Sequence, residues 1–457
     1  MARELPPDSK RLADWDRTFL WHPFTQMREW EQDVPLIIER GQGSYLIDTD
    51  GRRYLDGVSS IWVNVHGHRH PALDRALRRQ LGKIAHSTML GLSNRPAIEL
   101  GRALIRLAPK GLTRVFYSDD GSTAVEVALK MALQYWQQRV PAVRSKRTFL
   151  HLQLGYHGDT VGAMSVGGVE LFQGRFRPLL FRSYAAEAPY CYRCPLGLSY
   201  PTCTMRCIES VEAILKRRHQ DIAALIIEPL VQAAAGMVIA PPGYLTKIRA
   251  LCTQYHVLLI ADEVATGFGR TGRMFACDHE GITPDLMAVS KGLTGGYLPL
   301  AATLTTDAVY QAFLGDYGEW KAFFHGHSYT GNPLACAVAL ANLDVFRRER
   351  TLNRMKDGIR LLRRLLRPLS EFKHVGEVRQ CGYMVGLELV RDRSSRTPYP
   401  LEDRMGHRVA MEARRRGLLL RPLGNVVVLM PPLSMSLRDL RRMVAIVTVA
   451  IQTATES

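Results

Sequence analysis

The chain has 457 residues, of which 46% are hydrophobic and 23% charged, so we expect a globular protein of two or three domains. No apolar run reaches the roughly 18 residues of a membrane span, and the first residues carry no apolar secretory core; we therefore expect a cytoplasmic protein without a membrane partner. The net charge of +17 could indicate nucleic-acid binding, but the basic residues alternate with leucines in helix-like stretches and no zinc-finger or RNA-binding signature is present, so we expect solvated helix faces and no nucleic-acid partner.

The elements expected in chain order indicate an α/β protein. Residues 35–57 combine short apolar runs with Gly and Asp-Gly turn signals, which predicts a group of short strands. Residues 115–136 predict a strand, a loop and a helix. Buried strands rich in Val, Ile and Leu are then expected in the runs ALIIEPLV, VLLIADEV, LMAVSKGL and AATLTT. Because helix-period segments separate several of them, we predict a mostly parallel sheet.

The last hundred residues predict a basic helix, strands at GYMVGLELV and VVVLMPPL, and a final helix after Ser436. We expect the two ends of the chain to form one smaller α+β domain beside a large central domain. The expected limits are residues 1–70 and 341–457 for the two parts of the small domain and 71–340 for the large one.

The segment SDDGSTAVEVALKMALQYW predicts a phosphate-binding helix start. Thr123 and Glu126 have the spacing of a capping box, so we expect the helix to begin there. Gly121 would let the backbone approach a ligand, and Ser122 offers a hydroxyl and an N–H. Free N–H groups at a helix start attract anions. An ordinary capped helix is the competing interpretation.

An acid and a lysine each follow an apolar strand. Asp262 ends the strand of VLLIADEV, where ligands of open α/β sheets bind, and it could be structural or pair with a pyridinium nitrogen. Lys291 follows the strand of LMAVSKGL and precedes a Gly-rich loop. Such a lysine is either a surface charge or a desolvated amine able to form a Schiff base.

The blocks IIEP, ADEVATGFGRTG and SKGLTGGYLPL, with the phosphate segment and YHGDT in the same order, resemble the class III aminotransferases. The resemblance extends from WHPFTQM to VVVLMPPL. It implies a fold-type-I transferase that depends on pyridoxal 5′-phosphate. HPFTQM, VHGHRHP, GLSN, HGHSYTGNP and RPLGN resemble the biotin-pathway branch, which implies transamination of 8-amino-7-oxononanoate to 7,8-diaminononanoate in a homodimer with shared active sites.

The resemblance also implies roles for individual residues. Lys291 would form the Schiff base with the cofactor and then move a proton, Asp262 would hold the pyridine nitrogen, and Tyr156 would stack on the ring and line the substrate site. Further cofactor contacts would come from Gly121, Ser122, His327 and Ser328. Substrate contacts would come from Phe24, Ile61, Trp62, Tyr156, Gly326 and Arg421. The loop at Gly326 to Ser328 would reach the neighbouring subunit's site, and Arg421 would bind the carboxylate of the keto substrate.

Two positions depart from the branch that uses S-adenosylmethionine as amino donor. That branch carries paired tryptophans where this chain has Ile61 and Trp62, and a tyrosine where it has Phe24. Both departures resemble the branch that uses lysine. We expect S-adenosylmethionine as the donor and keep lysine as the second candidate. A general class III ω-aminotransferase, a racemase or decarboxylase of the same fold, and a basic binding protein on an inactive fold are the competing functions.

Four cysteines are clustered in CYRCPLGLSYPTCTMRC. Cys191, Cys194, Cys203 and Cys207 lie in a segment with prolines and a glycine, which predicts a loop with little core of its own. Four thiolates at such spacing can hold a structural zinc ion or an iron–sulfur cluster. Disulfides or four unconnected thiols would also fit the spacing. The remaining cysteines (Cys252, Cys277, Cys336 and Cys381) are expected to be buried and reduced.

Overall fold

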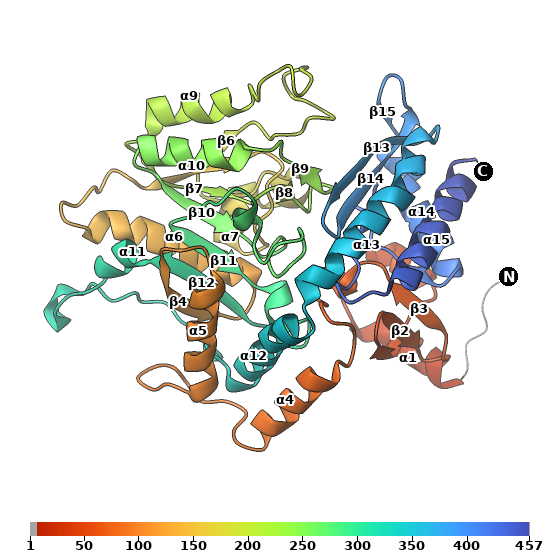
Figure 1. The fold of residues 1–457 in the computed structure, drawn as a ribbon, viewed down its shortest axis with the longest axis horizontal. Helices are drawn as coiled ribbons and strands as arrows, with labels where there is room; N and C mark the ends of the chain where they lie inside the picture. The colour runs from red at the N-terminus through yellow and green to blue at the C-terminus, as the bar shows by residue number, and fades with distance from the viewer. Residues whose placement is uncertain (1–6, 457) are drawn as a thin grey trace.

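The computed structural model describes residues 7–456 and has two adjoining parts (Figure 1). The larger part is built on a seven-stranded sheet in the order β4-β12-β11-β10-β7-β5-β6. Only β12 runs antiparallel to its neighbours, which confirms the expected mostly parallel sheet. The strands are β4 (Leu112–Ser118), β5 (Thr148–Leu152), β6 (Tyr184–Ala186), β7 (Ile222–Ile227), β10 (Leu258–Asp262), β11 (Leu286–Val289) and β12 (Ala301–Thr306).

The central strands are buried along their whole length. Every residue of β7, β10 and β11 is buried, as expected for runs of Val, Ile and Leu in a parallel sheet that helices cover on both faces. The helices of this part are α4 (Pro71–Leu81), α5 (Arg95–Leu107), α6 (Gly121–Gln138), α7 (Val161–Ser165), α8 (Glu170–Gln173), α9 (Ile208–Arg218), α10 (Tyr244–Gln254), α11 (Asp307–Gln311) and α12 (Pro333–Arg348). A two-stranded sheet of β8 (Val231–Gln232) and β9 (Val238–Ile239) follows β7.

Helix α6 begins earlier than expected. The capping box predicted from Thr123 and Glu126 is wrong: Asp120 is the N-cap, its carboxylate accepts from the Thr123 N–H at 2.9 Å, and the Thr123 hydroxyl accepts from the Asp120 N–H at 3.0 Å. Glu126 instead accepts from the N–H groups of Gly162 and Ala163, at 2.7 and 3.1 Å. An acid three residues before Thr123 already completes the box, so Gly121 and Ser122 form the first helical turn.

The smaller part combines both ends of the chain. Strand β16 pairs in parallel with β3, so one sheet contains segments about 360 residues apart (Figure 1 shows them in red and blue). The first sheet comprises β1 (Ile38–Gln42), β2 (Tyr45–Asp48), β3 (Arg53–Asp56) and β16 (Leu418–Leu419). The second comprises β13 (Val375–Cys381), β14 (Met384–Asp392), β15 (Thr397–Pro398) and β17 (Val426–Leu429). The helices are α1 (Pro7–Phe19), α2 (Met27–Gln32), α3 (Ser59–Trp62), α13 (Thr351–Leu366), α14 (Met405–Arg415) and α15 (Leu437–Thr455).

The final helix behaves as expected from its sequence. Ser436 is the N-cap of α15, and the apolar run MVAIVTVAI places Met443, Val444, Val447 and Ile451 in the core. Within residues 7–456 no helix combines the length and apolarity needed to cross a bilayer. The domain limits stay a prediction; residue 340 lies inside α12, which packs on α4 and α5.

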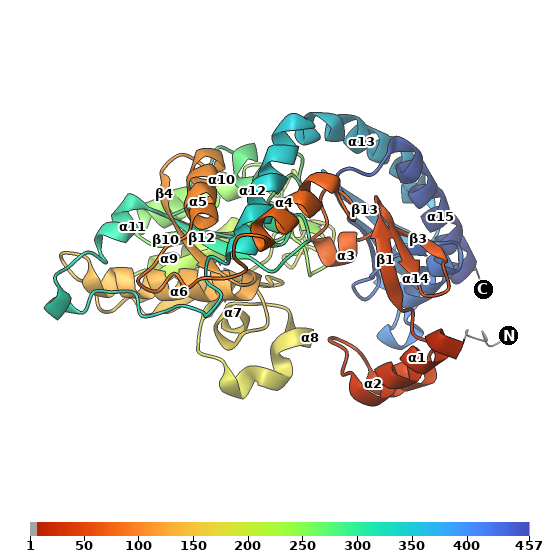
Figure 2. The same cartoon turned by 90° about the horizontal axis from the view of Figure 1, so that it is seen from below.

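Seen from below, the segment around α8 lies beside the loop that joins α1 to α2 (Figure 2). The rings of Phe24 and Phe172 meet there at 5.3 Å. The large part, through Phe172, and the small part, through Phe24, therefore contact each other on this side of the molecule.

Candidate active site

A cavity of about 480 Å³ lies where the carboxyl ends of β5, β7, β10 and β11 meet the start of α6. This is the edge at which open α/β sheets bind ligands. The structure brings together seven of the residues predicted from the sequence. Its lining includes Ile61, Trp62, Gly121, Ser122, Tyr156, Asp262 and Lys291.

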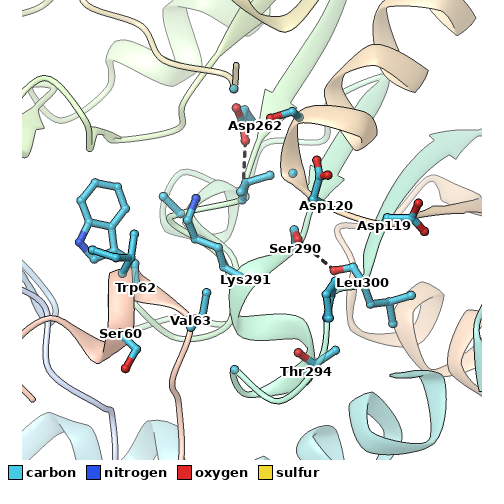
Figure 3. Close-up of a pocket in the computed structure, with 18 of the residues that line it drawn as sticks. Ser60, Trp62, Val63, Asp119, Asp120, Asp262, Ser290, Lys291, Thr294 and Leu300 are labelled. Atoms are coloured by element: carbon cyan, nitrogen blue, oxygen red, sulfur yellow. Dashed lines mark hydrogen bonds between the residues drawn. The ribbon is translucent and has the colours of Figure 1, made fainter. Parts of the chain in front are cut away.

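Lys291 projects into the cavity directly after β11 (Figure 3). Its backbone has a positive φ of 38°, and its Nζ lies 5.7 Å from the centre of the Trp62 ring. Burial lowers the pKa of Lys291, while the carboxylates of Asp262 and Glu228 oppose that shift. A lowered pKa makes more of the neutral amine available for attack on a carbonyl carbon.

Asp262 is held at the end of β10 by two hydrogen bonds. Its Oδ2 lies 2.7 Å from Nδ1 of His157, and its Oδ1 accepts from the Val264 N–H at 3.0 Å. Asp262 and His157 are both buried, so the contact is sheltered from competing water. Sequence reasoning singled out YHGDT but missed His157; the histidine after the aromatic residue was the available signal.

Glu228 is a second carboxylate at the cavity. It belongs to the IIEP block, but no role was predicted for it from the sequence. It accepts from the N–H groups of Tyr156 and Ala233, at 3.0 and 2.9 Å. Because β7 and β10 are neighbours and Ile227 faces Ala261, Glu228 lies beside Asp262. Burial raises the pKa of Glu228 to about 7, with a further contribution from Asp262.

The start of α6 forms a cradle without room for further side-chain atoms. A Cβ on Gly158 would lie 2.1 Å from the Ser122 Oγ, and one on Gly121 would lie 2.6 Å from a Val264 methyl carbon. The Ser122 hydroxyl also accepts from the Asp159 N–H at 3.3 Å. The glycines thus keep the first turn of α6 open to an anion, as a helix N-terminus requires.

Ile61 and Trp62 belong to a left-handed turn. Ser59, Ser60, Ile61 and Trp62 all have φ between 47° and 70°, a conformation that costs non-glycine residues roughly 1–2 kcal/mol each. Trp62 is buried against the cavity, whereas Ile61 is half exposed. Such strain in consecutive residues is typical of binding sites.

The aromatic wall continues from Tyr156. Its hydroxyl donates to Asp159 at 2.9 Å, and its ring meets Phe172 edge-on at 5.7 Å. Phe172 in turn contacts Phe24. The exposed Arg421 donates to the Phe24 carbonyl at 3.4 Å, so these two predicted substrate residues lie together outside the cavity lining.

The predicted subunit-crossing loop lies on the surface. Gly326 and Ser328 are exposed, and His327 Nδ1 lies 2.9 Å from Asp119, which lines the cavity. The loop therefore meets the rim of its own chain's cavity through His327. The roles predicted for its residues and for the other site residues stay predictions.

The four clustered cysteines line one small cavity, but the structure does not support a metal site. Among residues 7–456, no group of three or more His, Cys, Asp or Glu side chains is arranged to hold a metal ion. All four cysteines are free, and burial together with the neighbouring cysteines raises the pKa of Cys207 to about 11.

Hydrogen bonds and ion pairs anchor the cysteine loop to the small part of the molecule. Arg193 and Tyr190 both donate to Glu388 on β14, and Arg379 pairs with the same carboxylate. Arg396 donates to the Tyr192 carbonyl at 2.6 Å. The loop has little core of its own, as expected, but charged groups of the small part supply its anchor.

The cavity fits the pyridoxal phosphate that the sequence predicts. The first turn of α6 presents N–H groups and the Ser122 hydroxyl to a phosphate. Asp262 retains acceptor capacity toward a protonated ring nitrogen, and Lys291 supplies the amine. A side chain at Gly158 would collide with Ser122 in this cradle.

Comparison with known proteins gives one consistent result. Residues 26–451 match the family model described as Aminotransferase class-III. The chain is 53% identical to the adenosylmethionine-8-amino-7-oxononanoate aminotransferase of Geobacter sulfurreducens, over 98% of this chain and 99% of the relative. It is 46% identical to the enzyme of that name from Staphylococcus aureus, over 97% and 98% of the two chains.

Solved structures agree. The crystal structure of adenosylmethionine-8-amino-7-oxononanoate aminotransferase from Methanocaldococcus jannaschii matches with a TM-score of 0.93 and 45% identity, over 98% of this chain and 99% of that one. The ω-transaminase from Pseudomonas jessenii in complex with PMP also matches with a TM-score of 0.93, at 33% identity over 97% and 98%. The expected fold class is confirmed.

Proposed function

Since the chain belongs to the class III aminotransferase family and is therefore a pyridoxal-phosphate-dependent enzyme, we propose that it converts 8-amino-7-oxononanoate to 7,8-diaminononanoate in biotin synthesis. The observation that carries the proposal is the joining of Lys291, Asp262 and the α6 cradle in one cavity of a chain about half identical to relatives with that name. The Pseudomonas jessenii relative keeps a general ω-aminotransferase as the second candidate.

Asp262 and the start of α6 have different roles in binding the cofactor for transamination. When bound, pyridoxal phosphate supplies an electron sink for negative charge at the substrate carbon. Asp262, fixed by His157 and Val264, would hold the proton of the ring nitrogen. The N–H groups at the start of α6 and the Ser122 hydroxyl would bind the phosphate. The cradle would thus anchor one end of the cofactor while Asp262 orients the ring.

Lys291 moves the proton. Its Nζ would hold the cofactor, and as a free amine it would accept the proton from the donor's α-carbon. Burial lowers its pKa and so favours the neutral, basic form. Trp62 and Tyr156 cover the cavity with aromatic surface, which excludes water from the proton transfer.

Two substrates must use the site in turn. The keto acid carries a carboxylate at the end of a long apolar chain, and the planar guanidinium of Arg421 suits a carboxylate. Arg421 lies outside the cavity lining beside Phe24, and Phe24 reaches Tyr156 through Phe172. We propose that the chain of the keto acid follows this aromatic path from Lys291 to Arg421.

The amino donor is S-adenosylmethionine in the proposed reaction, as the relatives' printed name indicates for them. L-Lysine is the second candidate, and Ile61 and Phe24 favour it. Both lie at the substrate side of the site, where Ile61 is half exposed at the left-handed turn. An aliphatic side chain there offers less aromatic surface to a sulfonium cation than a second tryptophan would.

The proposed enzyme is a cytoplasmic homodimer with shared active sites. Large apolar side chains are exposed near the loop predicted to cross between subunits, including Tyr317, Trp320, Phe324 and Tyr329. Exposed aromatic groups of this kind are typical of an interface. Ser328 would then contact the partner's bound phosphate.

The experiment that tests the function is a product assay with purified enzyme and bound cofactor. Enzyme with 8-amino-7-oxononanoate and each donor separately should form 7,8-diaminononanoate, identified by mass. Turnover of simple ketones with no conversion of the keto acid would replace the proposal with the general ω-aminotransferase.

A further inference from the structure

The left-handed turn Ser59–Trp62 is closed by its own backbone. The Trp62 N–H donates to the Val58 carbonyl at 2.8 Å, and the Val63 N–H donates to the Ser59 carbonyl at 3.0 Å. Ile61 is β-branched, and a positive φ is rarely adopted by such residues. A turn built from these side chains persists only where its surroundings determine it.

Arg270 contacts the turn from its buried side. Its side chain is fully buried, with 1% exposure. One terminal nitrogen, Nη2, donates to the carbonyls of Trp62 and Asn64, at 3.0 and 2.8 Å. The other, Nη1, donates to the Pro431 carbonyl at 2.8 Å and to the Ser59 hydroxyl at 3.2 Å. The guanidinium therefore contacts both ends of the turn and the segment after β17.

The contacts depend on the handedness of the turn. A right-handed turn over the same residues would direct its groups elsewhere, and the buried Arg270 would lose the Trp62 carbonyl and the Ser59 hydroxyl as acceptors. Asp56 holds the opposite side, accepting from the Ser60 N–H at 3.1 Å and from the Ser60 hydroxyl at 3.0 Å. Ser59 also donates to the Met430 carbonyl at 2.6 Å.

The turn carries two residues that line the cavity of the reacting amine. Trp62 and Lys291 lie side by side in Figure 3, with Nζ 5.7 Å from the ring centre. Ile61 stands at the open side of the same cavity. A change in the turn would move both side chains together, while Asp262 and the α6 cradle belong to other elements.

We propose that Arg270 is a positioning residue for substrate selection: it holds Ser59–Trp62 in the left-handed conformation and so sets the width of the passage between Trp62, Ile61 and Lys291. Arg270 does not line the cavity, so it acts through the turn. The inference rests on the proposed keto-acid reaction for its kinetic consequence, but the conformation of the turn is measurable without any substrate.

The decisive variant is Arg270→Lys, compared with Arg379→Lys as a matched control. Arg379 is also a buried arginine, bound to Glu388 and to the Gly236 carbonyl at 2.7 Å, and it does not line the cavity. A lysine retains the charge but lacks the fork that serves acceptors on two sides. We expect Arg270→Lys to raise KM for the keto acid by about tenfold or more, with a smaller change in kcat, and to alter the near-UV circular dichroism.

Combining Arg270→Lys with Trp62→Phe shows whether Arg270→Lys acts through the turn that carries Trp62 or disturbs the whole protein. The near-UV change caused by Arg270→Lys should largely vanish in the Trp62→Phe background, and the two KM effects should combine to less than their product because both act through the turn. Titration of cofactor-free protein with pyridoxal phosphate should give an affinity close to that of the wild type, because the cradle is unaffected.

Three results would overturn the proposal: unchanged KM and near-UV spectrum in Arg270→Lys, the same changes in Arg379→Lys, or fully independent effects of Arg270→Lys and Trp62→Phe. If Arg270→Lys does not fold, Ser59→Ala removes one Arg270 acceptor without stranding a charge. It should shift the near-UV spectrum in the same direction by a smaller amount, and an unchanged spectrum counts against the proposal. A normal near-UV response with no keto-acid turnover in the wild type would reject the proposed function alone.

Discussion

Gly158→Ala tests whether the glycine makes room for the phosphate cradle. The added Cβ would lie 2.1 Å from the Ser122 Oγ, 2.6 Å from its Cβ and 2.8 Å from its Cα. Rotating the Ser122 hydroxyl would remove only the contact with Oγ. The contacts with Cβ and Cα would persist because Ser122 belongs to the first turn of α6. Overpacking costs about 1–3 kcal/mol, and φ of +129° adds about 1 kcal/mol or more. We expect a loss of about 3 kcal/mol in folding stability.

The same substitution should weaken cofactor binding. Displacing the Ser122 hydroxyl removes a hydrogen bond to a charged phosphate, worth about 1.5–3 kcal/mol, which corresponds to roughly 10- to 100-fold in the dissociation constant. The assay is titration of cofactor-free protein with pyridoxal phosphate, followed by visible absorbance. Gly197→Ala is the control, since Gly197 also has a positive φ, +65°, but nothing lies within 4 Å of its added Cβ.

The comparison between the two variants isolates the steric effect. Gly197→Ala should show only the strain of the positive φ, with cofactor affinity unchanged. If Gly158→Ala binds pyridoxal phosphate as tightly as Gly197→Ala, then Ser122 can move away from the added Cβ without loss of affinity. The assignment of Ser122 to the phosphate would then lose its support.

The reacting lysine, a buried acid, the subunit-crossing loop and the donor can each be tested separately. Lys291→Ala should retain its fold by circular dichroism yet lose turnover, and full transamination by this variant would reject the role of the lysine. Burial raises the pKa of Glu228 to about 7, so between the pKa of Glu228 in the unfolded chain and this value the native state binds one proton more than the unfolded state. The free energy of unfolding therefore falls as pH rises through this window, by a loss on the order of 3 kcal/mol by linkage. Denaturation at pH 5 and pH 8 should show this loss in the wild type and not in Glu228→Gln. If Ser328 completes the partner's site, mixing inactive Lys291→Ala and Ser328→Asp proteins should restore about a quarter of the wild-type activity through mixed dimers, and an active monomer in sedimentation would contradict the shared site. With each donor supplied alone, S-adenosylmethionine should support product formation, whereas turnover with lysine only would reverse the donor assignment.

Much of the fold follows from local pattern. Short apolar runs flanked by turn residues favour buried strands, so β7, β10, β11 and β12 were predictable. Ser436 and the apolar face after it likewise predicted α15. The start of α6 was misplaced because several polar residues in a row offered caps at similar spacing, and packing chose Asp120 by engaging Glu126 with α7.

The chemistry at the strand ends was also readable from the order of residues along the chain. Asp262 ends an apolar strand and Lys291 follows one, and parallel strands bring their carboxyl ends to one edge. The pairing of β10 with β11 makes the two residues neighbours. The cysteine cluster shows the limit of such reasoning. Its spacing suited a metal, but the loop is anchored through Arg193 to Glu388, 195 residues away along the chain.

The groups that surround the reacting residues depend on contacts between distant segments. His157, Glu228 and Arg270 stand inside recognisable motifs, yet their partners lie on other segments: His157 reaches Asp262, Glu228 binds the Tyr156 N–H, and Arg270 holds the turn before Asn64. The physical reason is that a buried charge must find partners wherever the packed chain places them. The sequence thus determines which side chains lie at the ends of the strands, whereas the packing of distant segments determines their hydrogen-bond partners.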